Sequence, residues 1–278
     1  MRIGLITCKN LPEPDPDAAP LAAALRDAGH EPVSVPWDDE KVPLHGFDLF
    51  VLRSCWNYYT EPDRFLAWID QAAAAAPLIN TPEVVGWNIH KRYLLTLEQA
   101  GVPVVRSRFV HQGEQTSEDP FCDFTDELVI KPAISAGSFG VRRFGTHERD
   151  AAREYLQSLA KQRDVMIQPH LSGFRDPGER NLIWIEGEWT HAIRKHPRYA
   201  GDDERVEGGV PPTREELKVA DAALAQVPYK LRYARADLVP DEEGRIRLSE
   251  LELLEPSLFF DYSSAALQRF VQMIENAA

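Results

Sequence analysis

The sequence predicts an α/β unit followed by a larger α+β unit, and two observations support this. Strands and helices alternate along the first eighty residues, which favours a parallel sheet with helices on its faces. After about residue 105 short strands dominate, as is typical of an α+β arrangement. We therefore expect an N-terminal unit at 1–82 and a second unit at 83–278, with a subdomain at about 106–167.

The composition limits the classes of protein that fit. The 278-residue chain has 44% hydrophobic and 27% charged residues, which is ordinary for a soluble globular protein. Its net charge of -13 argues against broad binding to nucleic acid or to an anionic membrane, because both require a basic face. The spacing of Cys8, Cys55 and Cys122 predicts neither a disulfide framework nor a zinc site. We expect a cytoplasmic protein, and its oligomeric state stays open, a homo-oligomer included.

Apolar runs and stop signals place the elements of the N-terminal unit and the helix that follows it. The expected strands are 2–7, 31–37, 47–53 and 77–81. The expected helices are 17–29, with Gly29 as its stop, 61–76, with Pro62 in its first turn, and 81–101, with Gly101 as its stop.

The second unit is predicted mainly from short β-branched and aromatic runs. The expected strands are 107–111, 127–132, 140–144, 165–169, 181–186, 189–195, 233–239 and 245–254. The expected helices are 148–160 and 214–227.

The segment LVIKPAISAGSFGVRRF, residues 128–144, joins two of these strands through small residues directly after Lys131. Small residues leave backbone N–H groups uncovered, so this loop could close over phosphates. It is not a Walker A motif, because no G-x-x-x-x-G-K-[ST] pattern occurs and the loop leads into a strand. The alternative is a solvent-exposed hairpin whose glycines only satisfy turn geometry.

A second candidate site is an arginine pair on the hairpin RNLIWIEGEWTHAIR, residues 180–194. A three-residue turn at 186–188 would place Arg180 opposite Arg194. Like charges directly opposite each other destabilise a sheet, so a bound anion between them would explain the pair. A two-residue turn would shift the pairing by one, and two solvated arginines are the alternative.

A third candidate site is acidic. In RIRLSELELLEP, period-two alternation predicts that Ile246, Leu248, Glu250 and Glu252 share one face, with the two glutamates about 6.6 Å apart at the backbone. Asp237 on the preceding strand supplies a third carboxylate. Oxygen donors without His or Cys suit Mg²⁺ or Mn²⁺. A solvated charged edge strand is the alternative.

The order of these features resembles the ATP-grasp ligases, and most closely the glutathione synthetase and ribosomal-protein S6 modification type. The resemblance covers roughly 83–262, and the first unit resembles the half-Rossmann domain that precedes the ATP-grasp fold. It implies a ligase that uses ATP and Mg²⁺ to activate a small carboxylate as an acyl phosphate, which an amine then attacks, with release of ADP. Cyclisation or phosphorylation of an amino-acid derivative is one alternative, and a non-catalytic ATP-binding sensor or assembly module is another.

The resemblance also implies roles for individual residues. The nucleotide lysines would be Lys91 and Lys131. The loop over the phosphates would comprise Ser135, Ala136, Gly137, Ser138 and Gly140. The hinge that binds adenine would include Gln168, His170 and Leu171, and Glu179 would reach the ribose or the substrate.

The remaining implied roles concern phosphate transfer and the metal. Arg180 and Arg194 resemble the arginines that hold the transferring phosphate, and Asp237, Glu250 and Glu252 would hold magnesium. The chain departs from the family at His90, where Asp is frequent, and at Glu252, where Asn is usual. A third carboxylate preserves the hard-oxygen character of the metal site.

The substrate end is indicated by VLRSCWNYY, residues 51–59, which follows a strand end, where ligands bind in such sheets. Arg53 could pair with a substrate carboxylate, with Trp56, Asn57 and Tyr58 around the pocket. An aromatic plug at a domain interface is the alternative. The motif also resembles ATP-grasp enzymes of amino-acid-derived natural-product pathways, including the one that closes the cycloserine ring, which implies a small amino-acid-like substrate.

Overall fold

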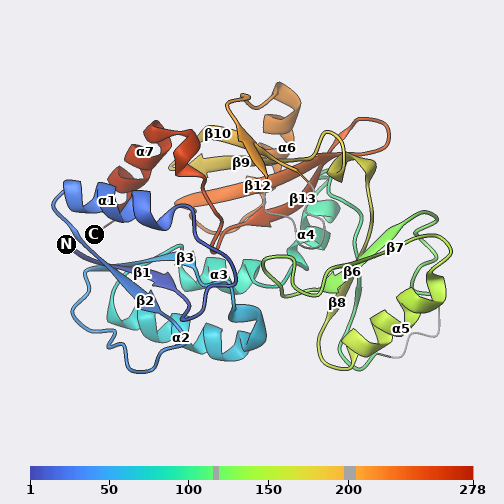
Figure 1. Cartoon of the computed structure of the whole chain (residues 1–278), viewed down its shortest axis with the longest axis horizontal. Helices are drawn as coiled ribbons and strands as arrows, with labels where there is room; N and C mark the ends of the chain where they lie inside the picture. Colours follow the sequence, from blue (N-terminus) through green and yellow to red (C-terminus); the bar gives the residue numbers. More distant parts are fainter. Residues whose placement is uncertain (115–118, 197–204, 278) are drawn as a thin grey trace.

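The computed structural model describes residues 1–114, 119–196 and 205–277, which form three sheets (Figure 1). The first sheet is parallel with strand order β2-β1-β3-β4, as the alternation of strands and helices predicts. Its strands are β1 (Arg2–Thr7), β2 (Glu31–Pro36), β3 (Leu49–Ser54) and β4 (Leu78–Ile79). The helices of this region are α1 (Ala18–Asp27) and α2 (Pro62–Ala75).

The other two sheets are antiparallel. The smaller one has the order β5-β8-β6-β7 and packs against α5 (Arg149–Ala160). Its strands are β5 (Arg108–Val110), β6 (Leu128–Pro132), β7 (Arg142–Phe144) and β8 (Val165–Pro169). The larger sheet has the order β11-β10-β9-β12-β13 and lies above and between the other two in Figure 1. Its strands are β9 (Glu179–Ile185), β10 (Glu188–Lys195), β11 (Val206–Gly208), β12 (Tyr233–Pro240) and β13 (Ile246–Glu252).

The two faces of the five-stranded sheet are covered by different helices. One face packs on α4 (Tyr93–Gln99) and α6 (Arg214–Leu224), and it buries Leu182, Ala192, Ala234 and Leu251. The opposite face buries Ile183, Ile185, Ile193 and Tyr233 together with residues of the first sheet. Successive side chains of a strand point to opposite faces, so each residue of β9, β10 and β12 belongs to one side.

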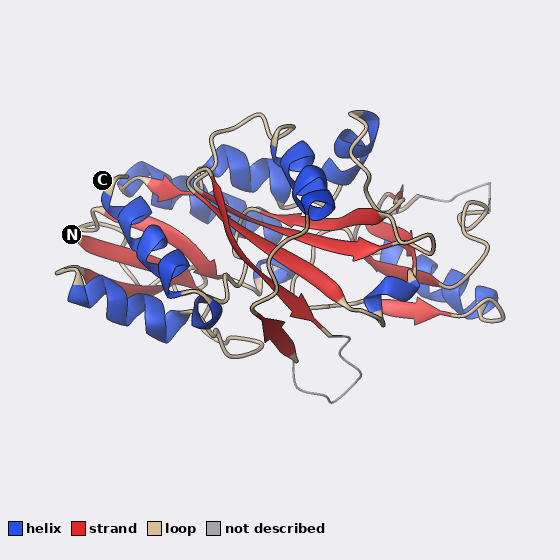
Figure 2. Ribbon diagram, turned by 90° about the horizontal axis from the view of Figure 1, so that it is seen from above, coloured by secondary structure: helices blue, strands red, loops and turns tan. Residues whose placement is uncertain are grey.

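Two helical features differ from the sequence prediction. The helix expected at 81–101 is broken into α3 (Pro82–Asn88) and α4, and Lys91 lies in the break. The helix α7 (Ser264–Glu275) was not predicted. It packs against α1 and brings the C-terminus beside the N-terminus, as both views show (Figures 1 and 2). No helix among the described residues is long and apolar enough to cross a bilayer.

Asp17 ties the segment after β13 to the first sheet. Its fully buried carboxylate accepts hydrogen bonds from the amides of Leu258, Phe259 and Phe260, at 2.5, 3.3 and 2.9 Å. It also pairs with Arg53 of β3, whose Nη2 lies 3.1 Å from Asp17 Oδ2 and also donates to the carbonyl of Pro256. Residues 256–260 are therefore held in place by one carboxylate near the start of the chain.

Replacement of Asp17 by Ala should lower the free energy of unfolding by about 3–5 kcal/mol, because it leaves a buried guanidinium and three amides without their acceptor. Urea unfolding followed by circular dichroism measures the loss. The exposed Asp27→Ala change on the same helix is the control and should stay within about 0.5 kcal/mol of the parent. A loss below about 1 kcal/mol for Asp17→Ala would contradict the conclusion that Asp17 holds residues 256–260 in place.

Candidate active site

A cavity of about 390 Å³ lies where the three sheets meet. Fourteen of the sequence-predicted site residues line it, and they come from all three sheets and their loops: Trp56, Tyr58, Lys91, Lys131, Ser135, Ala136, Gly137, Ser138, Gln168, His170, Glu179, Asp237, Glu250 and Glu252. The other predicted site residues are not part of the lining: Arg53, Asn57, Gly140, Leu171, Arg180 and Arg194. The cavity thus brings residues far apart in sequence to one place.

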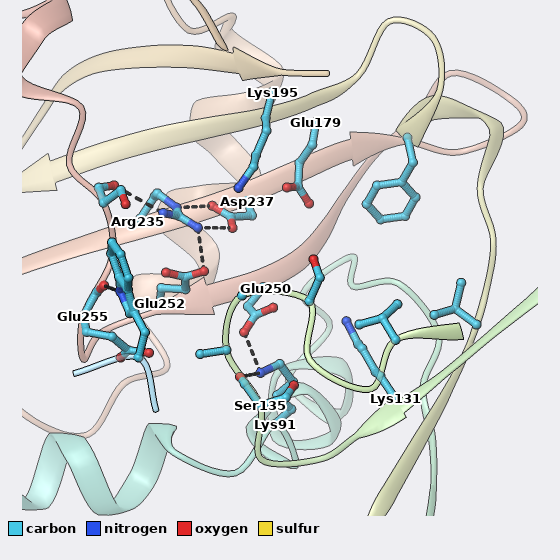
Figure 3. A pocket seen from close by; sticks show the side chains of 18 of the residues that line it. Lys91, Lys131, Ser135, Glu179, Lys195, Arg235, Asp237, Glu250, Glu252 and Glu255 are labelled. Carbon is cyan, nitrogen blue, oxygen red and sulfur yellow. Dashed lines mark hydrogen bonds and ion pairs between the residues drawn. The ribbon is translucent and has the colours of Figure 1, made fainter. Parts of the chain in front are cut away.

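Two lysines flank one carboxylate in this cavity (Figure 3). Lys91 is buried, and its Nζ lies 2.9 Å from Glu250 Oε1 and donates to the carbonyl of Ser135 at 2.7 Å. Lys131 enters from β6. Burial lowers the pKa of Lys131, and the negative charge of Glu250 opposes that effect. Burial also disfavours an ionised Glu250, but Lys91 and Lys131 together bring its pKa below the ordinary value.

A second cluster surrounds Arg235, which the sequence analysis missed. Its Nε and Nη2 lie 2.8 and 2.9 Å from the two carboxylate oxygens of Asp237, and Nη2 lies 2.5 Å from Glu252 Oε1. Arg235 precedes Asp237 by two residues on β12, so both side chains point to the same face. That spacing was the signal available in the sequence.

A β-bulge directs the glutamates of β13 into the cavity. Asp237 pairs with Glu250 but Leu238 pairs with Leu248, so Ser249 is an extra residue. Leu248 therefore packs in the core on the α6 side, whereas Glu250 and Glu252 line the cavity. The prediction that Ile246 and Leu248 share a face with these glutamates is wrong, because strict alternation does not continue through a bulge.

The bulged residue also positions a further carboxylate. Ser249 Oγ donates to Glu179 Oε1 at 2.6 Å and to the carbonyl of Asp237 at 3.0 Å. Glu179 begins β9 and lines the cavity opposite β13. Burial, and next the negative charge of Asp237, raise the pKa of Glu179 to about 7.

The carboxylates have the chemistry of a site for a hard divalent cation. Asp237, Glu250 and Glu252 offer only oxygen donors, which suit Mg²⁺ or Mn²⁺. Burial raises the pKa of Glu252 well above its ordinary value, although Arg235 opposes this. Within 1–114, 119–196 and 205–277, no three Asp, Glu, His or Cys side chains are arranged to hold a metal ion as they stand. Lys91 and Arg235 contact oxygens of all three carboxylates, so a bound cation would have to displace these contacts.

The predicted arginine pair is real but faces away from the cavity. Arg180 lies opposite Arg194 as predicted, but the turn has two residues, Glu186 and Gly187, and a bulge at Thr190 restores the register. Both arginines share the α6 side of the sheet, since their neighbours Glu179 and Lys195 point into the cavity.

Glu216 of α6 relieves the repulsion between these like charges. Its Oε1 lies 3.0 Å from Arg180 Nε, and the Arg180 Nη2 donates to the carbonyl of Val210 at 2.9 Å. Arg194 Nη1 donates to the carbonyl of Pro177 at 3.1 Å. Arg180 thus has a carboxylate partner within the protein and Arg194 a carbonyl partner, and the anion expected between them stays a prediction.

The predicted substrate motif divides into two parts. Arg53 is buried against Asp17, and Asn57 accepts from Trp37 Nε1 at 2.6 Å and donates to Asp38, so both bind other protein groups rather than the cavity. Trp56 and Tyr58 do line the cavity. Arg53 and Asn57 are therefore not placed to bind a ligand in the cavity, and the substrate role of Trp56 and Tyr58 stays a prediction.

The small-residue loop forms the β6–β7 hairpin and lies against the first unit. The Tyr58 hydroxyl donates to the carbonyl of Ser135 at 3.4 Å, and the rings of Tyr59 and Phe139 stack with centroids 4.2 Å apart. Gly140 has a φ of +65°, and a Cβ there would lie 2.9 Å from the ring of Pro132, so this position requires glycine. The loop covers the cavity beside Lys131.

The predicted hinge lies at the end of β8. Gln168 and His170 line the cavity, and the Gln168 side chain donates to Ser107 Oγ at 2.9 Å. The His170 amide donates to the carbonyl of Glu127 at 2.9 Å. Leu171 lies outside the lining and precedes the short 3₁₀ helix Ser172–Phe174. His90, the departure from the family pattern, contacts Asp164 at 3.2 Å instead of the cavity.

A further carboxylate that lines the cavity, that of Glu255, was not identified in the sequence analysis. It follows β13, it is 8% exposed, and its carbonyl accepts from Trp56 Nε1 at 3.0 Å. Burial raises the pKa of Glu255 to about 7, although the positive charge of Lys91 and a hydrogen bond with the side chain of Tyr58 oppose the effect. No spacing rule marked this residue, because β13 ends before it.

Comparisons with known proteins all indicate similarity to one group of enzymes. The family profile described as "D-cycloserine synthetase DcsG, N-terminal domain" matches residues 3–80. The cycloserine biosynthesis protein DcsG of Streptomyces lavendulae is 30% identical, over 94% of this chain and 93% of that protein. A crystal structure of D-cycloserine synthetase DcsG superimposes with a TM-score of 0.88 at 28% identity, covering all of both chains. D-alanine–D-alanine ligase from Bacillus anthracis complexed with ATP shares the fold, with a TM-score of 0.71 at 18% identity, covering 100% of this chain and 97% of that one.

Replacement of Glu255 by Gln should stabilise the protein at alkaline pH and leave its stability near pH 4.5 almost unchanged. The folded-state pKa of Glu255 is about 7, above its ordinary value of 4.5, so burial of the charged form costs stability progressively as pH rises from 4.5 through 7. The gain at pH 8 should be on the order of 3 kcal/mol.

Urea unfolding of both proteins at pH 5 and pH 8 measures this difference. The exposed turn residue Glu243 provides the control, and Glu243→Gln should show the same small effect at both pH values. An equal effect of Glu255→Gln at the two pH values would show that the charge of Glu255 is not buried at a cost.

Proposed function

Because the chain belongs to the ATP-grasp ligase family of the cycloserine biosynthesis protein DcsG, which makes it an ADP-forming carbon–nitrogen ligase, we propose that it activates a small carboxylate or amino-acid derivative through an acyl phosphate. The membership confirms the ATP-grasp fold that the motifs predicted and replaces the sensor interpretation. We propose ATP and Mg²⁺ (or Mn²⁺) as the cofactors and the cytoplasm as the location.

One observation carries the proposal: four cationic side chains and a set of carboxylates converge in one cavity. Lys91, Lys131, Lys195 and Arg235 line the same space as Asp237, Glu250 and Glu252. A triphosphate requires concentrated positive charge, which a protein of net charge -13 must supply locally. The paired carboxylates fit the cation that accompanies a nucleotide.

In the proposed reaction a substrate carboxylate oxygen attacks the γ-phosphorus of ATP, and the bond to the β–γ bridging oxygen breaks to release ADP. The nitrogen of an amine then forms a bond to the acyl carbon, phosphate leaves, and the amine gives up a proton. Such chemistry depends on positioning and charge neutralisation rather than on covalent catalysis by the protein. Asp237, Glu250 and Glu252 would hold the metal, which neutralises phosphate charge when bound.

Different residues of the chain would have different roles in this reaction. Lys91 and Lys131 would hold phosphate oxygens, and Arg235 replaces Arg180 and Arg194 as the arginine placed to stabilise the transferring phosphate. The loop of Ser135 to Ser138 would exclude water above the phosphates, while backbone groups near Gln168 and His170 would receive adenine. We propose that the first unit, 1–82, forms the substrate side through Trp56 and Tyr58.

A second candidate reaction is ring closure, in which the attacking amine belongs to the activated molecule itself. The similarity to cycloserine synthetase along the whole chain favours this outcome. Phosphorylation without a second step would leave a stable phosphorylated product. The mass of the product distinguishes an amide, a ring and a phosphate.

Lys131→Ala should weaken binding of ATP by about 10–100-fold, because it removes a half-buried positive charge that lines the proposed phosphate site. Titration calorimetry with Mg·AMP-PNP measures the affinity. Arg194→Ala is the matched control, since Arg194 lies on the other face of the sheet and its loss should change the affinity less than about twofold. Unchanged affinity of Lys131→Ala would remove Lys131 from the nucleotide site.

Glu250→Gln should leave the fold intact and lower the rate of ADP formation by at least about 100-fold, because it removes a charge that holds both Lys91 and the metal. ADP release is measured with Mg·ATP and a panel of amino acids and their derivatives. Substrate-dependent ADP that disappears in the variant is the expected result. Normal ADP production by Glu250→Gln would contradict the metal assignment.

A further inference from the structure

Glu255 differs from the carboxylates of Asp237, Glu250 and Glu252 in its charge balance. Lys91 is paired with Glu250, and Arg235 is paired with both Asp237 and Glu252. Within the part of the chain that the structure describes, Glu255 forms no ion pair, although it is 8% exposed and lines the cavity. A buried carboxylate without a cationic partner is costly, so this position has the chemistry of a site that a ligand completes.

The groups around Glu255 suit a cationic ligand. Trp56 and Tyr58 line the same part of the cavity, and the Trp56 indole is fixed by its hydrogen bond to the Glu255 carbonyl. Aromatic faces attract cations, most strongly where water is excluded. A ligand carboxylate would instead be repelled by Glu255, and a neutral alkyl group would leave the charge without a partner.

We propose that Glu255 binds a primary ammonium group of the substrate, beside Trp56 and Tyr58, and thereby selects carboxylates that also carry an amine. Glu255 follows Glu252 by three residues, which corresponds to at most ~10 Å of chain. One small zwitterion can therefore contact Glu255 with its ammonium group and present its carboxylate to the phosphate end of the cavity. This inference rests on the proposed function only for the position of the reacting carboxylate.

The test compares two probes that differ only in the amine. Wild type and Glu255→Gln, both loaded with Mg·AMP-PNP, are titrated with D-serine, with L-serine and with 3-hydroxypropionate, and binding is followed by ligand-observed NMR. We expect wild type to bind one serine enantiomer at least tenfold more tightly than 3-hydroxypropionate. Glu255→Gln should lose that preference, with its affinity for 3-hydroxypropionate and for AMP-PNP changed less than twofold.

Two outcomes would overturn the proposal. One is a wild type that does not prefer either serine enantiomer over 3-hydroxypropionate. The other is a Glu255→Gln variant that loses affinity equally for the probes with and without the amine. Glu255→Asp, which keeps the charge, should retain part of the preference, and the surface change Glu243→Gln should retain all of it.

Failure of the proposed function gives a different result. If the ligase proposal is wrong, no carboxylate will stimulate ADP release, and the binding preference for the amine will still depend on Glu255. If only the inference about Glu255 is wrong, ADP release will still depend on a carboxylate. In that case Glu255→Gln will change ADP release to the same extent for substrates with and without an amine.

Discussion

The balance of buried charge along β12 and β13 is the constraint on which the cavity depends. Asp237, Glu250 and Glu252 point together into one cavity, where an unpaired carboxylate would be costly. Arg235 and Lys91 supply the positive charge, and Lys91 can do so because the helix around it is broken between α3 and α4. In the proposed function the same cations would meet phosphate, so nucleotide binding would require them to exchange partners.

The alternation of side chains along the five-stranded sheet determines which charged residues face the cavity. Arg180 and Glu179 are neighbours in sequence, yet one meets Glu216 beneath the sheet and the other lines the cavity. The bulge at Ser249 shifts Glu250 and Glu252 to the face opposite Leu248. A shift of one residue in the strand register thus separates side chains that pack in the core from side chains that line the cavity.

The bulges at Thr190 and Ser249 bear on where prediction from sequence succeeded and where it failed. The parallel N-terminal sheet, the β6–β7 hairpin and most strands follow from local patterns, and Lys131 and the glycine loop follow from position within them. Bulges depend on the partner strand, so alternation alone assigned Leu248 to the wrong side, whereas the bulge at Thr190 left Arg180 opposite Arg194 as predicted. Arg53 looked like a ligand residue because its partner, Asp17, lies thirty-six positions away. The helix α7 was missed although its apolar face buries Phe270 and Ile274 against α1.

The segment that leaves β13 connects the two halves of the site. It carries Glu252 at the phosphate end, then Glu255 beside Trp56, and it is then fixed by Asp17 at Leu258 to Phe260. Because three amides bind one fully buried carboxylate, this segment cannot shift without loss of contacts in the first unit. The position of Glu255 relative to Glu252 is therefore set by the docking of the first unit. A change in that docking would therefore alter the distance between Glu255 and the carboxylates of β13.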